Sequence, residues 1–345
     1  MPFQQNGRLR PPLPLTMLSF DPKASADPLR PISLPEGPSS DLRRALAATK
    51  LLCLEFVHVA PCDANLPAFK GDLWRSVLGM GLRDSSPRAY DAVFRDHDLP
   101  PGRRSARWAL QAPLQQQRRV IQGSSLRSKI TLFGPAIDFA QDFVKAMAAF
   151  EQSGVGRQGQ RLALQLQSVQ AMTPAGPQPL DSPSATVCAL DVFDAARADV
   201  VAHGPTSSLR VAFLSPIELK SDNQQVRGAP TFEVLMRRIF SRVVAVAPTL
   251  DGGLFARGED LAWHNWSAGI AMLNDATVTA GPGRHYSATQ GREHPLMGTG
   301  GVVEYAAPAC KALPWLRLAE WMQLGKKTHY GFGVVDATPG QSQHR

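Results

Sequence analysis

Twice in this chain, once in each half, a helix is followed by a glycine-rich turn and then by a strand. In the first half a helical pattern over residues 136–152 is followed by Gly154–Gly159 and a strand. In the second half a helical pattern over residues 314–324 is followed by Gly325–Gly333 and a strand. This shared order indicates a diverged internal duplication, and it predicts two copies of one fold.

The order of the expected elements is the same in the two halves. Apolar runs, alternating patterns and helical spacings predict strand, helix, strand, strand, helix, strand, although the second strand of each half is poorly defined. The clearest strands are expected at residues 51–59, 129–133, 161–169, 208–214, 301–306 and 331–335. This β-α-β-β-α-β order predicts an α+β protein of two tandem ferredoxin-like domains, similar to RRM-like modules.

The composition between the patterned segments indicates the domain boundaries. Residues 1–44 are rich in proline and have no helical or strand period, which predicts a disordered leader. We expect an N-terminal ferredoxin-like domain over residues 45–170 and a C-terminal one, with the second glycine-rich loop, over residues 208–340. Residues 171–207, which begin with a stretch rich in proline, glycine and serine, are expected to link the two domains.

The chain is basic, with a formal net charge of +8 over 345 residues and a sequence pI of about 9.6. Arginine outnumbers lysine, and guanidinium groups pair with phosphate through two hydrogen bonds and stack on bases. This balance is typical of a nucleic-acid-binding protein. A generic basic surface would have the same charge, so charge alone does not decide between the two.

The sequence lacks the patterns of several other functional classes. Its four cysteines are scattered and its eight histidines show no H-x-x-x-H spacing, so neither a zinc site nor a disulfide framework is expected. The G-x-G-x-x-G match at Gly154–Gly159 follows a helix and precedes a strand, the reverse of a dinucleotide-binding turn. No P-loop, G-x-S-x-G turn or apolar run of membrane-spanning length is present. We expect a cytoplasmic protein without a metal or other cofactor.

The second glycine-rich loop is the first candidate for binding an anionic backbone. Glycine lets backbone amides approach a ligand closely, and the loop adds two lysines and a histidine as donors. The expected contacts in this loop are Gly325, Lys326, Lys327, His329, Gly331 and Gly333. The alternative is an ordinary glycine-rich turn with solvated lysines.

The helix that starts at Pro230 is the second candidate. Its apolar residues follow a helical spacing, and Arg237, Arg238 and Arg242 occupy the other face. Such a row of arginines would follow an anionic backbone. The alternative, which is favoured by this pattern alone, is a solvated helix surface.

Four segments, taken in order, resemble the CRISPR-associated endoribonucleases of the RAMP superfamily, which cut repeat RNA. The motifs of that family are an l-P-x-F-K-G-x-x-x-R opening, an L-F-G block with a later G-x-G, a P-T-F-E-x-L-x-R-R helix, and an R-Y-S-x-x-Q, G-G and glycine-rich ending. The matching segments are Leu66–Arg83, Leu132–Gly156, Pro230–Arg238 and Gly283–Gly333. The resemblance covers about residues 50 to 337. The chain departs from the family in lacking a cysteine cluster over residues 84–100 and in having His285 within the R-Y-S motif.

The resemblance implies a reaction and a set of catalytic residues. A ribose 2′-hydroxyl attacks the adjacent phosphate, which leaves a 2′,3′-cyclic phosphate and a 5′-hydroxyl without a metal ion. Histidine and tyrosine suit proton transfer near neutral pH, and lysine or arginine stabilises the phosphorane. The implied base is His58 at the end of the first strand, for which a structural strand-end histidine is the alternative. The second choice is His285 with Tyr286, and the expected further phosphate contacts are Lys70, Arg75 and Arg284.

A different class of function also fits the resemblance. The chain could be a non-catalytic RAMP-type subunit of a CRISPR effector complex that holds repeat RNA without cutting it. Its expected partners are CRISPR repeat RNA and the subunits of such a complex. A metabolic enzyme on the same fold would need a cofactor motif that the sequence lacks.

Overall fold

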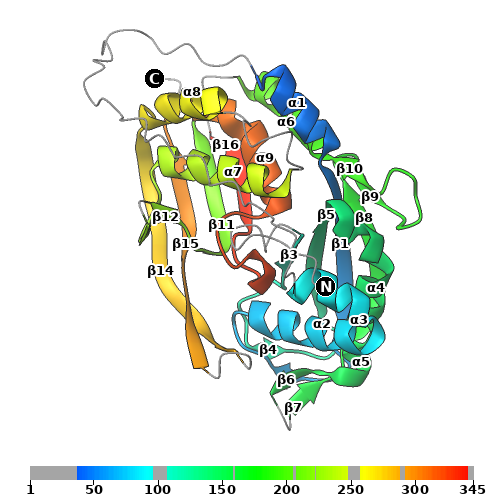
Figure 1. Ribbon diagram of the computed structural model, residues 1–345. Helices are drawn as coiled ribbons and strands as arrows, with labels where there is room; N and C mark the ends of the chain where they lie inside the picture. Colours follow the sequence, from blue (N-terminus) through cyan, green and yellow to red (C-terminus); the bar gives the residue numbers. More distant parts are fainter. Residues whose placement is uncertain are drawn as a thin grey trace, which may run out of the picture. The chain divides into compact units, whose positions relative to one another are not determined.

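The structure is a computed structural model of the 345-residue chain (Figure 1). It describes residues 37–95, 107–157, 160–204, 207–221, 223–247, 257–287 and 292–340. The described residues all belong to one compact unit, Leu34–Arg345. Residues 1–36 of the expected leader therefore lie outside the described residues.

The first half of the described chain forms a six-stranded antiparallel sheet with the order β3-β5-β1-β8-β9, and β10 also pairs with β1. The strands are β1 (Lys50–Val59), β3 (Trp108–Gln111), β5 (Ser125–Phe133), β8 (Gln165–Thr173), β9 (Gly176–Gln178) and β10 (Val187–Cys188). The apolar β1 lies at the centre, where Leu54 pairs with Ile130 on one side and Ala171 on the other. Burial on both sides explains its nearly continuous apolar run.

Helices α2 (Gly71–Ser85) and α4 (Ala140–Ala148) lie on one face of this sheet (Figure 1). The buried apolar residues of α2 recur every three to four positions, which gives the helix one apolar face. They are Trp74, Val77, Leu78 and Leu82. A 3₁₀ turn over Gly134–Phe139, with Pro135 in its first positions, leads into α4.

The second half repeats the topology with the sheet order β14-β15-β11-β16. Its elements are β11 (Leu209–Ile217), α7 (Phe232–Val246), α8 (Arg257–Ala268), β14 (Met272–Ser287), β15 (Arg292–Tyr305), α9 (Leu313–Met322) and β16 (Val335–Pro339). In each half the second strand lies at an edge, followed by the third, first and fourth strands of the repeated unit. The predicted fold of two tandem ferredoxin-like domains is confirmed.

The core of the second half includes an aromatic cluster between α7, α8 and α9. The ring centroids of Phe240 and Trp315 lie 4.7 Å apart, and those of Trp263 and Trp315 lie 5.9 Å apart. Trp263 also meets Trp266 edge to face at 5.3 Å. These contacts fix α8 against α7 and α9, because large buried rings tolerate few alternative packings.

The segments expected to be leader and linker contain two helices. α1 (Ser40–Ala48) begins where the side chain of Ser39 accepts a hydrogen bond from the amide of Leu42. α6 (Ala189–His203) lies within the expected linker, and Phe193 of α6 packs on Trp315 at 4.7 Å between ring centroids. Residues 171–207 are therefore structured in their described part, with β9 and β10 in the first sheet and α6 against the second half.

Short elements complete the described chain. They are β2 (Ala64–Asn65), α3 (Pro87–Tyr90), a π-helical turn (Asp91–Arg95), β4 (Arg119–Val120), α5 (Phe150–Ser153), β6 (Val155–Arg157), β7 (Gln160–Leu162), β12 (Lys220–Ser221) and β13 (Gln224–Gln225), with 3₁₀ turns η4 (Ala309–Ala312) and η5 (Thr328–Tyr330). Among the described helices, none has the length and apolar character needed to cross a membrane.

Candidate nucleic-acid interface

The glycine-rich loop Gly325–Gly333 of the second half packs against the start of α2 in the first half. A Cβ atom on Gly71 would collide with the carbonyl oxygen of Tyr330, and one on Gly331 would lie 3.1 Å from the Cα atom of Gly71. Phe69 meets Phe332 edge to face, with ring centroids 5.3 Å apart. Glycine at positions 71 and 331 therefore permits direct backbone contact between the two halves.

The glycines of this loop serve its turns, which corrects part of the expectation. Gly325, Gly331 and Gly333 have φ angles of +82°, +80° and +84°, a region that favours glycine. The amide of Gly333 donates to the carbonyl of Pro216 at 2.9 Å, and that of Gly331 donates to Thr328 at 3.2 Å. Because these two amides are used within the protein, they are not available for phosphate, and the loop's cationic side chains are the better candidates.

Three cations from separate elements gather at this loop: Lys220 on β12, Arg238 on α7 and Lys326. Burial lowers the pKa of Lys326, and the charges of Lys220 and Arg238 lower it further, while Glu218 opposes them. Lys327 pairs with Glu218, with 2.7 Å between Nζ and Oε2. Because Lys220 and Arg238 repel the ammonium group of Lys326, an anion bound here would relieve that repulsion. Lys220, Arg238 and Lys326 are hereafter the cationic cluster.

Arg75 on α2 faces the same loop. Its guanidinium carbon lies 4.2 Å from the ring centroid of Tyr330 and 5.1 Å from that of Phe94. Burial raises the pKa of Tyr330, although the charge of Arg75 opposes the rise, so the phenol stays protonated at neutral pH. His329 lies beside this pair, with its ring centroid 4.6 Å from that of Tyr330. The contact between α2 and the glycine-rich loop thus combines a cation, a hydroxyl donor and an imidazole.

Arg242 is not part of a surface row of arginines. Its side chain is only 6% exposed, and its Nε and Nη2 donate to the carbonyl of Met322 at 2.9 and 2.7 Å. The guanidinium also lies over the ring of Phe133, 5.3 Å from the centroid. Burial lowers its pKa to about 10. Arg242 therefore binds the carbonyl end of α9 inside the protein, and the expected phosphate contact is corrected.

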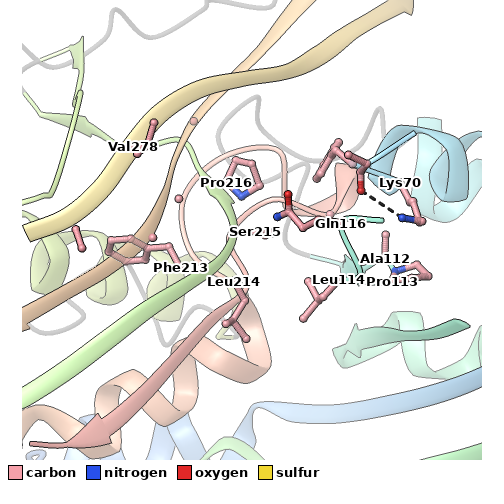
Figure 2. Close-up of a pocket in the computed structure, with 17 residues that line it drawn as sticks. Lys70, Ala112, Pro113, Leu114, Gln116, Phe213, Leu214, Ser215, Pro216 and Val278 are labelled. Carbon is pink, nitrogen blue, oxygen red and sulfur yellow. Dashed lines mark hydrogen bonds between the residues drawn. The ribbon is translucent and has the colours of Figure 1, made fainter. Parts of the chain in front are cut away.

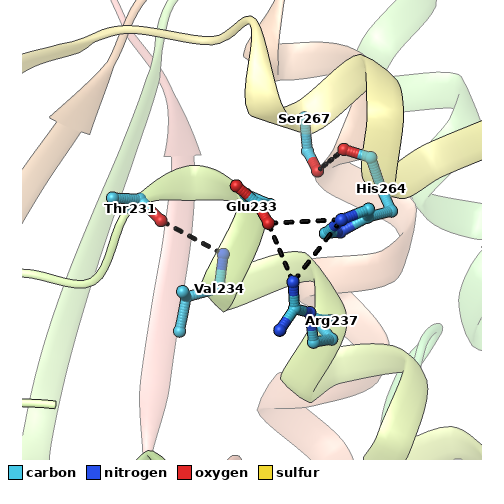
Figure 3. Close-up of polar contacts among 6 residues, drawn as sticks. All are labelled: Thr231, Glu233, Val234, Arg237, His264 and Ser267. Carbon is cyan, nitrogen blue, oxygen red and sulfur yellow. Dashed lines mark hydrogen bonds and ion pairs between the residues drawn. The ribbon is translucent and has the colours of Figure 1, made fainter. Parts of the chain in front are cut away.

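Arg237 lies on a different side of α7 from Arg238 and contacts α8. Its Nη2 donates to Oε1 of Glu233 at 2.8 Å and lies 3.4 Å from Nε2 of His264 (Figure 3). The same carboxylate oxygen lies 3.2 Å from His264. An RNA phosphate at Arg237 would have to compete with Glu233, so this residue is the weaker of the two candidates.

Lys70 is also held inside the protein. The side chain is 1% exposed, and its Nζ donates to the carbonyls of Gln115, Ala68 and Gln117 at 2.5, 3.3 and 3.4 Å. Burial lowers its pKa. The ammonium group thus joins the start of α2 to the loop after β3, and the expected phosphate contact at Lys70 is corrected.

His58 lies in the core between β1 and the helices of the first half. It has no exposed surface, its Nε2 is 3.0 Å from the carbonyl of Met147, and its ring stacks on Phe150 at 5.2 Å between centroids. Burial lowers its pKa. In this position the imidazole has no surface that a ligand could contact, and the geometry matches the structural alternative.

Three further candidate residues lie on β14 of the second half. They are Arg284, His285 and Tyr286, which pair with Pro295, His294 and Glu293 of β15, and their side chains lie outside the described part. All four cysteines are free. In the part of the chain that the structure describes, no group of three or more histidine, cysteine, aspartate or glutamate residues could hold a metal ion.

Two family models match the chain, one in each half. Residues 211–335 match the model described as CRISPR-associated endoribonuclease Cas6, and residues 48–189 match a model described as an N-terminal domain. A search of curated proteins gives no match. The Cas6 match includes the glycine-rich loop, Lys220 and the three arginines of α7.

Solved structures share the fold at low sequence identity. A partial Cas6-RT-Cas1–Cas2 complex matches with a TM-score of 0.59 and 12% identity over 86% of this chain and 47% of that chain. The full complex gives the same score over 29% of its chain, so this chain spans less than half the length of these relatives. Thermus thermophilus Cas6 matches with a TM-score of 0.53 and 15% identity over 85% of this chain and 100% of that chain.

Proposed function

We propose that this chain, a CRISPR-associated protein of the RAMP superfamily, is an endoribonuclease that cuts precursor CRISPR RNA within its repeats. The observation that carries the proposal is the cationic cluster beside the glycine-rich loop, within the segment that matches the Cas6 model. A polyanion is the ligand that such a concentration of charge binds best. The fold and the loop together favour RNA as that polyanion.

The proposed chemistry needs no group other than the RNA and the side chains of the protein. The 2′-hydroxyl of a ribose attacks the adjacent phosphorus, and the bond from phosphorus to the 5′-oxygen breaks. The hydroxyl proton goes to a base, the departing oxygen takes a proton from an acid, and the products are a 2′,3′-cyclic phosphate and a 5′-hydroxyl. Nearby cations stabilise the extra negative charge on the phosphorane.

His329 and Tyr330 are the side chains best placed for proton transfer in the described structure. They lie in the same loop as Lys326 and Lys327, and Tyr330 contacts Arg75 across the two halves. The protonated phenol of Tyr330 suits donation to the departing oxygen, and the imidazole of His329 suits the base. The pair His285 and Tyr286 remains an alternative proposal, and buried His58 would require local opening.

A cleavage assay with the repeat RNA of the array nearest to the gene tests the proposal. Wild-type protein in EDTA should produce fragments that end in a 2′,3′-cyclic phosphate. A 2′-deoxy substitution at the nucleotide before the cut should abolish cleavage and leave binding unchanged, because it removes the nucleophile. Protein that binds this RNA and never cuts it would instead have the non-catalytic role of an effector subunit.

The similar solved structures also suggest protein partners. The first two solved relatives are described as complexes of Cas6, RT, Cas1 and Cas2. We propose CRISPR repeat RNA as the substrate and CRISPR-associated proteins as partners of this chain. Co-purification with the products of the neighbouring genes, before and after RNase treatment, separates direct contacts from those that RNA bridges.

A further inference from the structure

A cavity of about 400 Å³ lies beside the glycine-rich loop, between the two halves of the described structure (Figure 2). Side chains of Ala112, Pro113, Leu114 and Gln116, from the loop after β3, lie on one side of it in Figure 2, and those of Phe213–Pro216 and Val278 lie on the other. Gly331 of the glycine-rich loop also lines it. The volume is within the range of ligand-binding pockets.

The floor of this cavity is the face of the second sheet that the helices leave open. Small residues form it, with Ala276, Gly298 and Gly300 from β14 and β15. At the rim, Leu214 is 42% exposed and Val278 is 67% exposed. A flat apolar group that enters would therefore contact aliphatic side chains and backbone, and would shield them from water.

Lys70 holds in place the cavity wall that carries Gln116. Its ammonium group binds the carbonyls of Gln115 and Gln117, on either side of Gln116, whose side chain lines the cavity. Opposite, the hydroxyl of Ser215 accepts from the amide of Val334 at 3.0 Å and keeps its own proton for donation. An amide and a hydroxyl can together donate to and accept from the edge of a base.

Phe69 adds an aromatic surface to the cavity. Its half-buried ring lines the wall and is fixed edge to face on Phe332 of the glycine-rich loop. Bases stack on such rings without regard to sequence, so Phe69 would supply affinity for a base in the cavity, while Gln116 and Ser215 would supply selectivity. Among the described residues that line the cavity none carries a carboxylate, which favours an uncharged ring over a cation.

We propose that this cavity takes one unpaired nucleobase of a bound RNA and that Gln116 and Ser215 read its edge. The proposal rests on the proposed RNA-binding function. RNA is the occupant because Gly331 joins the cavity to the loop that carries Lys326 and Lys327. A strand whose phosphates lie at the cationic cluster can then place a base in the cavity.

The test combines a cavity-filling variant with abasic substitutions in the repeat RNA. Ala276→Phe fills the floor, and Asn274→Phe, two residues earlier on the same face of β14, is the matched control outside the cavity. Each unpaired position of the repeat RNA is made abasic in turn, and binding is measured with wild type and both variants. Gln116→Ala, with Gln117→Ala as its control, provides a second, gentler pair because both side chains are exposed.

One abasic position should weaken binding to the wild type and to Asn274→Phe roughly tenfold. The same abasic position should not weaken RNA binding to Ala276→Phe any further, because the phenyl ring already fills the cavity. Equal losses in wild type and Ala276→Phe, or unchanged affinity of Ala276→Phe and Gln116→Ala, would overturn the cavity proposal alone. If the wild type binds no repeat RNA, both this proposal and the proposed function fail.

Discussion

The guanidinium carbon of Arg75, on α2 of the first half, lies 4.2 Å from the ring centroid of Tyr330, in the glycine-rich loop of the second half. This contact joins the two ferredoxin-like halves at the place where the proposed catalytic groups meet. An arginine over a phenol ring gains about 1 kcal/mol when it is partly desolvated. The pair therefore couples the geometry of the site to the packing of the two halves.

The first prediction is that Arg75 and Tyr330 are energetically coupled. In a double-mutant cycle with Arg75→Met and Tyr330→Leu, the two changes should interact by about 1 kcal/mol in the free energy of unfolding. Urea denaturation of the four proteins measures this term. Arg88→Met, an exposed change on α3, combined with Tyr330→Leu should show no interaction, and additive effects of Arg75 and Tyr330 would contradict the prediction.

The second prediction concerns the cationic cluster. Lys326→Ala and Lys220→Ala should each weaken repeat-RNA binding and reduce the slope of log affinity against log salt by about 0.7 to 0.9, because each removes one proposed phosphate contact. Binding is measured by filter retention or anisotropy across a salt series. Lys145→Ala, an exposed change on α4, is the control for the loss of one charge. An unchanged slope in Lys326→Ala would place the RNA elsewhere.

The duplicated order of elements was sufficient to predict the topology because each half must bury one face of its sheet beneath helices of its own. α6 was missed because its apolar residues are spread around the helix. Phe193 packs on Trp315 of α9, while Asp194 pairs with Arg43 of α1 at 2.9 Å, so α6 lies between two neighbours and has no single apolar stripe. The proline-rich stretch before it also indicated a linker.

The site was predicted less completely, since sequence spacing does not reveal which face of a helix another element covers. Arg238 and Arg242 are one turn apart on α7. The charge of Arg238 nevertheless lowers the pKa of Lys326, while Arg242 donates hydrogen bonds to the carbonyl of Met322. Lys220 stands alone in the sequence, and only the packing of β12 brings it to the loop. Lys70 lies in the motif that predicted a phosphate contact. Two of the carbonyls that bind its ammonium group belong to residues 45 and 47 positions later, which the sequence alone does not indicate.

The third prediction separates the two histidines. His329→Ala should lower the cleavage rate by about 10²–10⁴ and leave affinity for repeat RNA nearly unchanged, as expected for the loss of a proton-transfer group. His58→Ala should lower the free energy of unfolding by about 2 kcal/mol, because it removes a buried ring and its hydrogen bond, and the folded fraction should still cut.

Single-turnover cleavage and urea denaturation on both histidine variants provide the readouts. Tyr330→Phe is the companion of His329→Ala, since it keeps the ring over Arg75 and removes only the hydroxyl. A His58→Ala protein that is stable and binds RNA but does not cut it would make His58 the base. Full cleavage by His329→Ala would leave His285 and Tyr286 as the remaining candidates.

The fourth prediction is that Arg242 is structural. Arg242→Met should lower the free energy of unfolding by about 2 kcal/mol, since the buried carbonyl of Met322 loses both hydrogen bonds to the guanidinium. The salt slope of RNA binding should stay the same, in contrast to Lys326→Ala. Arg88→Met controls for the lost charge, and a reduced salt slope in Arg242→Met would return Arg242 to the RNA contacts.

The last prediction is a pH dependence of stability that originates at Glu320 on α9. Its carboxylate accepts hydrogen bonds from the amide of Ala337 at 2.8 Å and from Nη1 of Arg317 at 2.8 Å. Burial nevertheless raises its pKa to about 7 from a usual value of 4.5, because desolvation of the charge outweighs the pull of Arg317.

Between pH 4.5 and about 7 the unfolded chain loses the Glu320 proton while the folded protein keeps it, so stability must fall as pH rises through this window. The full difference is about 3 kcal/mol, since each unit of pKa is about 1.4 kcal/mol. Urea denaturation at several pH values should show this fall in the wild type. In Glu320→Gln the fall should be smaller by that amount, and in Glu151→Gln, an exposed change on α5, it should persist. Parallel curves for wild type and Glu320→Gln would show that the hydrogen bonds hold Glu320 charged in the folded state.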